Sequence, residues 1–138
     1  MLFRSEGERV DLGLTGKVAI VTGGSRGIGK AIAVELAREG VDLVLAARDV
    51  PTLEATAAEI RAASGRRVLP LTVDTGDEAS VAAMVQAAHQ EFGHIDILVN
   101  AAARPATQGP ALTLETTTAE AFWADANIKV LEIGRAHV

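Results

Sequence analysis

Short apolar runs alternate with longer segments of helical spacing along this sequence. The runs span residues 18–21, 41–46, 67–73 and 95–99. The first run has no polar alternation, which is typical of a parallel strand covered by helices on both faces. The clearest helical stripe comprises Val81, Met84, Val85, Ala88 and Phe92. This alternation predicts an α/β fold, in which right-handed crossovers join the strands of a parallel sheet.

Local signals place a helix face and one edge of the sheet. The first helix is expected from Gly27 onward, with Ile28, Ile32 and Leu36 on one face. The third apolar run contains Pro70, which has no N–H to donate to a central ladder and so indicates an edge strand. This agrees with the strand order 3-2-1-4 of a Rossmann-type doubly wound sheet.

A glycine-rich turn follows the first apolar run. The spacing Thr22-Gly23-x-x-x-Gly27-x-Gly29 leads directly into the predicted helix. Glycines allow a tight turn, close approach of a pyrophosphate to the backbone, and close packing of helix on strand. An anion would then lie at the helix N-terminus, where unpaired N–H groups favour it. An ordinary strand-to-helix loop is the alternative interpretation.

Composition narrows the class of protein. The 138 residues suffice for one domain, and 49% of them are hydrophobic while only 3% are aromatic. The net charge of −5 argues against nucleic acid and against an anionic membrane surface as partners. The absence of cysteine excludes disulfides and thiolate metal sites and fits a reducing compartment. We also find no apolar segment of membrane-spanning length, so a cytoplasmic protein is expected.

The two ends of the chain are expected to be foreign to the fold. The nucleotide string GTGCTCTTCCGATCT can encode the opening residues, read from a GTG start, and GAGATCGGAAGAGCACACGTC can encode residues 132–138. The second string contains the reverse complement of the first, which matches a common short-read sequencing adapter. We expect residues 1–5 and 132–138 to be adapter-derived flanks of a gene fragment covering 6–131. A coincidence in the degenerate code is the alternative.

The glycine spacing and the β-α alternation resemble those of the short-chain dehydrogenase/reductase family. The resemblance covers nearly all of residues 6–131, which would be the N-terminal, cofactor-binding half of that family's domain, truncated after about four strands. It implies an oxidoreductase that transfers hydride between NADP(H) and a carbonyl or alcohol carbon of a small molecule, in a parent that is a homo-oligomer. The cofactor contacts implied are Thr22, Gly23, Ser25, Arg26, Gly27, Ile28, Gly29, Arg48, Asp74, Asn100, Ala101 and Ala102.

The end of the second strand bears on the choice between NADP and NAD. An NAD-preferring site places a carboxylate there for the ribose 2′-hydroxyl, and that carboxylate would repel a 2′-phosphate. This chain has Ala47 at that place, followed by Arg48, and Arg26 lies in the glycine loop. Arginine suits phosphate because its guanidinium is planar and permanently charged. We therefore expect NADP rather than NAD, although Arg48 beside Asp49 is also compatible with a solvated surface charge.

Two further positions match the family less fully. Asp74 falls where the family has an aspartate that hydrogen-bonds the adenine ring, and a turn aspartate is the alternative. The family usually has Asn-Asn-Ala-Gly after the fourth strand, whereas this chain has Asn100-Ala101-Ala102-Ala103. Ala101 therefore lacks the amide that ties neighbouring strands together. Asp96 is expected to be structural.

Only one residue of the family's catalytic tetrad is expected in this chain. Asn127 matches the asparagine that holds a water of the proton relay, and a solvated helix residue is the alternative. The family's serine and Tyr-x-x-x-Lys pair would lie further on, and this chain contains no tyrosine. In that family the tyrosine is the general acid or base and the lysine lowers its pKa. The rival hypothesis is a non-catalytic nucleotide-binding module.

Overall fold

The structure is a computed structural model that describes residues 10–102 and 118–120. Three helices and four strands alternate along the first of these ranges. Their bounds are β1 Val18–Thr22, α1 Gly27–Arg38, β2 Asp42–Ala47, α2 Val50–Ser64, β3 Val68–Thr72, α3 Glu78–Phe92 and β4 Ile97–Asn100. The α/β prediction is confirmed, and the strand bounds differ from the predicted runs by one or two residues.

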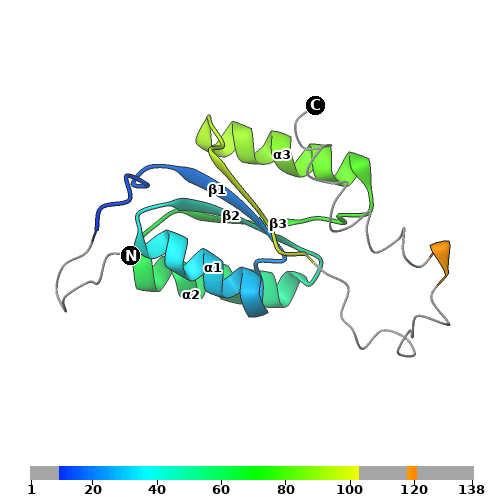
Figure 1. Ribbon diagram of the computed structural model, residues 1–138, viewed down its shortest axis with the longest axis horizontal. Helices are drawn as coiled ribbons and strands as arrows, with labels where there is room; N and C mark the ends of the chain where they lie inside the picture. The colour runs from blue at the N-terminus through cyan, green and yellow to red at the C-terminus, as the bar shows by residue number, and fades with distance from the viewer. Residues whose placement is uncertain (1–9, 103–117, 121–138) are drawn as a thin grey trace.

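The four strands form one parallel sheet in the order β3-β2-β1-β4. Thr22 at the end of β1 is in register with Ala46 of β2 and with Asn100 of β4. In Figure 1, α1 and α2 cover one face of the sheet and α3 covers the other. This is the doubly wound arrangement predicted from the sequence, and β3, which contains Pro70, lies at an edge as expected.

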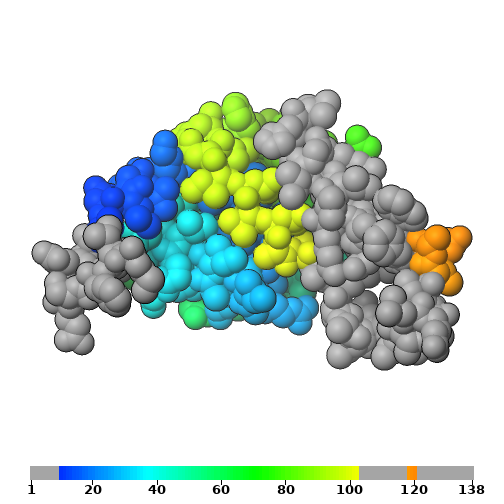
Figure 2. All heavy atoms as spheres, viewed as in Figure 1, coloured from blue at the N-terminus to red at the C-terminus, as the bar shows by residue number. Residues whose placement is uncertain are grey.

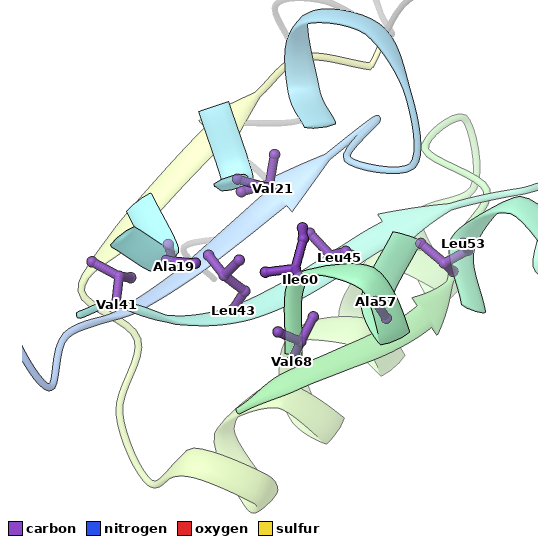
Figure 3. Packing of buried hydrophobic residues seen from close by; sticks show 11 residues of the cluster. Ala19, Val21, Val41, Leu43, Leu45, Leu53, Ala57, Ile60 and Val68 are labelled. Carbon is purple, nitrogen blue, oxygen red and sulfur yellow. The ribbon is translucent and has the colours of Figure 1, made fainter. Parts of the chain in front are cut away.

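Each face of the sheet has its own hydrophobic layer. Alternate residues of β1 point to opposite faces, so that Ala19 and Val21 pack towards α1 and α2, while Val18 and Ile20 pack towards α3. Figure 3 shows Leu53, Ala57 and Ile60 of α2 lying over the strands of the first layer. All four of those β1 residues are at most 2% exposed, which explains why the run carries no polar residue.

The predicted packing face of α1 is wrong at Ile28 and confirmed in part at Leu36, which packs against the first hydrophobic layer. Ile28 is 78% exposed, and the buried positions of this helix are Gly29, Ala33 and Ala37. Small residues let the helix approach the sheet closely, so the larger side chains are displaced to the flank of the contact. The stripe predicted for α3 is confirmed, since four of its five members are buried and Val85 packs against them.

Polar contacts close the amino ends of the strands. The Asp42 side chain, 6% exposed, pairs with Arg66 at 2.9 Å and Arg67 at 3.2 Å. Asp96 Oδ2 accepts a hydrogen bond from the backbone N–H of Val18 at 2.9 Å, which confirms its structural role. These bonds satisfy strand-end groups that would otherwise be unpaired.

Candidate nucleotide-binding site

The glycine-rich turn lies at the carboxyl edge of the sheet, between the ends of two strands. Gly23 N–H donates to the Ala46 carbonyl of β2 at 2.8 Å, and Ala101 N–H donates to the Thr22 carbonyl at 3.2 Å. Figure 2 shows the surface of the β4 segment, in yellow, beside that of α1, in blue and cyan. In open α/β sheets, ligands bind at this edge, where the crossover direction reverses. Here that reversal falls between β1 and β4.

The three glycines of the motif have three different surroundings. A Cβ on Gly23 would lie 2.7 Å from the Ala101 carbonyl oxygen, and one on Gly29 would lie 2.2 Å from the Gly23 carbonyl oxygen. Gly27 has a φ of +60° and nothing within 4 Å of a Cβ. Gly23 and Gly29 therefore permit close packing, whereas Gly27 leaves an open space over the turn. That space is where a phosphate can approach the backbone.

The N-terminus of α1 is open to an anion. Arg26 is its N-cap, with an extended backbone at φ −159° and ψ 172°, and no side chain caps the helix. The first turn also has no acidic residue. The N–H groups of the first turn and the helix dipole therefore favour a negatively charged ligand at this point. Ile28 is exposed beside this opening.

Two arginines stand at the same edge without partners. Arg48 directly follows β2, and both Arg26 and Arg48 are exposed. Within residues 10–102 and 118–120, neither guanidinium makes a hydrogen bond or an ion pair. Asp49 accepts a hydrogen bond from the Thr52 hydroxyl at 2.6 Å, so its carboxylate is engaged at the start of α2. Position 47, where an NAD-binding site would carry an acidic residue, is an alanine, and Arg48 follows it. The end of β2 therefore suits a phosphate better than a ribose hydroxyl.

The segment after β4 is held by Thr22. Its hydroxyl donates to Asn100 Oδ1 at 3.0 Å, and Ala102 N–H lies 3.4 Å from the same hydroxyl oxygen. Thr22 is 7% exposed. These bonds join β1 to β4 and to the segment that follows it. Asn100, Ala101 and Ala102 are therefore brought beside the glycine turn, and their contact with a cofactor stays a prediction.

Asp74 follows β3 and is exposed. Its Oδ1 accepts a hydrogen bond from Gly76 N–H at 3.0 Å, and its own N–H donates to Ser80 Oγ at 2.9 Å. The turn role that we gave as the alternative is therefore present. Because one carboxylate oxygen is free of these bonds, a contact between Asp74 and an adenine ring stays a prediction.

One contact in the site had no sequence signal. Thr56, in the middle of α2 and 3% exposed, donates its hydroxyl to the Ser25 carbonyl of the glycine loop at 2.7 Å. Ser25 is itself 4% exposed. The bond joins residues 31 positions apart, so neither spacing nor local turn chemistry could have revealed it.

Several expectations fall outside the described residues. This group comprises Asn127, Ala103 and the two adapter-like ends, and the predictions made for them are untested. Thr118, Ala119 and Glu120 are described and exposed, and the last two are helical. In the described ranges, no three His, Cys, Asp or Glu side chains are grouped to hold a metal ion. No helix there is long and apolar enough to cross a membrane.

A doubly wound sheet with an open glycine turn and unpaired cations at its carboxyl edge defines a dinucleotide-binding α/β protein. The family model described as short chain dehydrogenase matches residues 17–130 of this chain. The chain therefore belongs to the short-chain dehydrogenase family.

Similar proteins agree with this assignment. An uncharacterized oxidoreductase of Caenorhabditis elegans is 47% identical over 91 residues, which are 65% of this chain and 29% of that protein. L-sorbose reductase of Gluconobacter frateurii, solved with NADPH and L-sorbose, superposes with a TM-score of 0.82 at 37% identity, over 92% of this chain and 47% of that one. A short chain dehydrogenase/reductase of Burkholderia phymatum, solved with NAD, superposes with a TM-score of 0.76 at 32% identity, over 89% of this chain and 42% of that one. This chain spans less than half the length of these relatives.

Proposed function

We propose that this chain is the dinucleotide-binding half of an NADP(H)-dependent dehydrogenase or reductase. The observation that carries the proposal is the open N-terminus of α1, with the open space over Gly27 and with Arg26 and Arg48, which have no partner among the described residues, at the same edge of the sheet. A bound NADP(H) supplies or accepts a hydride, and the protein's part in this half of the fold is to hold and orient the dinucleotide.

Each part of the site has a role in this proposal. The N–H groups at Gly27, Ile28 and Gly29 bind the pyrophosphate, where the helix dipole favours negative charge. Arg26 and Arg48 bind the 2′-phosphate, which gives NADP its preference over NAD. L-sorbose reductase, solved with NADPH, supports this preference, and the neighbour solved with NAD marks the alternative.

The remaining features of the parent are extrapolated from the family. The substrate is a small carbonyl or alcohol compound, and Asn127 contributes to the proton relay. We propose a homo-oligomeric parent in the cytoplasm. Residues beyond this chain supply the serine and the Tyr-x-x-x-Lys pair, because the chain itself contains no tyrosine.

The test compares NADPH and NADH binding to the chain and to Arg48→Ala, by titration calorimetry. Losing one charge-assisted hydrogen bond costs about 1.5–3 kcal/mol, which is on the order of 10–150-fold in affinity. We expect Arg48→Ala to weaken NADPH binding by that factor and to leave NADH binding nearly unchanged. Arg38→Ala is the matched control, since Arg38 is paired with Glu35 at the far end of α1. Equal weakening of both dinucleotides, or of neither, contradicts the role of Arg48.

A non-catalytic nucleotide-binding module is the second candidate. The coding sequence that follows residue 131 in the genome distinguishes the two. Continuation into a serine and Tyr-x-x-x-Lys supports the oxidoreductase, and a stop codon or an unrelated sequence supports the binding module.

A further inference from the structure

We infer that Thr56 is a positioning residue that holds the glycine loop in the form that selects NADP(H) over NAD(H). This inference rests on the proposed function. It assigns a role in the site to a residue that lies outside the glycine motif, on the neighbouring helix α2. The contact between Thr56 and Ser25 is the observation that leads to it.

The Thr56 hydroxyl has little freedom to move. Its residue is 3% exposed, and Leu53 and Ala57 on the same helix are 1% and 0% exposed. Figure 3 shows these two neighbours on the side of α2 that faces the sheet. Ser25 is also buried, at 4% exposure. If the Thr56 hydroxyl were removed, water could not easily reach the Ser25 carbonyl to replace the hydrogen bond of 2.7 Å. Thr56 therefore anchors the loop to a rigid part of the fold.

The bond also sets the direction of the neighbouring peptide group. In a planar trans peptide, the C=O of one residue and the N–H of the next point in opposite directions. With the Ser25 carbonyl turned towards α2, the Arg26 N–H points away from α2. Because Arg26 is the N-cap of α1, this peptide sets the direction in which the Arg26 side chain leaves the backbone.

The same bond joins the two arginines through the backbone. The helix that carries Thr56 begins at Val50, shortly after Arg48, and the loop that accepts its hydrogen bond contains Arg26. On the exposed surface, Lys30 and Glu59 pair at 2.7 Å and add a second link between α1 and α2. The backbone segments that carry Arg26 and Arg48 are thus held relative to one another before a ligand arrives, which preorganises the attachment points of the two side chains.

Removal of the hydroxyl should affect the two dinucleotides differently. Thr56→Val keeps the shape of the side chain and leaves the Ser25 carbonyl without its donor, so the Ser25–Arg26 peptide reorients. Only NADPH carries the 2′-phosphate that Arg26 binds. We expect NADPH affinity to fall about tenfold, in keeping with one lost or misplaced charged contact, and NADH affinity to fall by less than about threefold.

The experiment measures both affinities by calorimetry for the chain, Thr56→Val, Thr56→Ser and Ser64→Ala. Thr56→Ser retains a hydroxyl and should restore NADPH binding. Ser64→Ala is the control. Ser64 lies at the C-terminal end of α2, away from the glycine loop, and its hydroxyl also donates to a backbone carbonyl, that of Ile60, at 2.6 Å. Amide hydrogen exchange without dinucleotide is a second readout: exchange across residues 23–29 should rise in Thr56→Val and not in Ser64→Ala. Should Thr56→Val fail to fold, Thr56→Ala, which adds no bulk, takes its place.

A double variant tests whether Thr56 acts through Arg26. In an Arg26→Ala background, Thr56→Val should have no further effect on NADPH affinity. Equal loss for NADPH and NADH, failure of Thr56→Ser to restore binding, or full additivity with Arg26→Ala overturns the inference while leaving the proposed function intact. Binding of neither dinucleotide by the unaltered chain overturns the proposed function, and the inference with it.

Discussion

Gly29→Ala tests the packing that holds α1 against the glycine turn. The added methyl carbon would lie 2.2 Å from the Gly23 carbonyl oxygen, 2.8 Å from its carbon and 3.2 Å from Gly24 Cα. All three are backbone atoms, so no side-chain rotation can relieve the contact. The first distance is about 1.2 Å short of the 3.4 Å at which ordinary contact begins. Either α1 moves away from the sheet or the turn opens.

The loss of stability in Gly29→Ala depends on which contacts are disturbed when α1 or the turn moves. Ala33 and Ala37, which are 0% and 3% exposed, pack against the sheet through the same helix face. Overpacking of this kind costs typically about 1–3 kcal/mol, and we expect the upper end because only backbone can yield. Gly27→Ala is the matched control, since it meets nothing within 4 Å. Its cost is the left-handed backbone alone, about 1–2 kcal/mol.

Urea denaturation followed by circular dichroism compares the free energies of unfolding of the two variants. We expect Gly29→Ala to be the less stable, and Gly27→Ala to remain folded while losing NADPH affinity, because its methyl group enters the space proposed for the pyrophosphate. If Gly29→Ala unfolds at the same urea concentration as Gly27→Ala or a higher one, the packing argument is refuted. NADPH binding by Gly27→Ala within a few-fold of the unaltered chain would refute the placement of the pyrophosphate.

Three further substitutions probe stability, each by the same urea measurement. Asp42→Asn should cost about 1–3 kcal/mol, less than a fully buried pair, because Arg66 and Arg67 are 30% and 59% exposed; a change no larger than that of Glu35→Gln, in an exposed pair, would contradict this. Leu43→Ala should cost about 2–5 kcal/mol, since Leu43 is fully buried, and a loss below about 1 kcal/mol would show that the sheet repacks. Asp77→Ala should cost about 1 kcal/mol, because its carboxylate caps α3 by accepting from Ala79 N–H; an unchanged midpoint would mean that water replaces the cap.

The sequence predicted the parts of the fold that depend on local signals. Pro70 identified the edge strand because a missing N–H excludes a central ladder, and the spacing of apolar residues from Val81 to Phe92 identified α3. The packing face of α1 was missed in part, for a physical reason. Hydrophobicity favours Ile28, whereas close approach to the sheet selects Gly29 and the alanines, which carry a weak apolar signal.

The candidate site also contains some features that local sequence signals predict and others that only the tertiary structure reveals. The glycine turn and Arg48 could be proposed from the sequence because their chemistry is encoded in a short segment, and their role in binding stays a prediction. The distinct roles of Gly23, Gly27 and Gly29 required the distances to their surroundings. Thr56 was not predicted because its partner is a backbone carbonyl on a distant loop, and a carbonyl leaves no mark in the sequence.

The register of β4 has a consequence for the order of folding. The β1–β2 and β2–β3 ladders each join strands that are neighbours in the chain, whereas the β1–β4 ladder pairs Ala19 with Ile97. Closing that longer loop costs more chain entropy, so this ladder is expected to form after the other two. Thr22 meets Asn100 only at this step. The nucleotide-binding edge is therefore completed late in folding, and newly made chains acquire it only after the rest of the sheet has assembled.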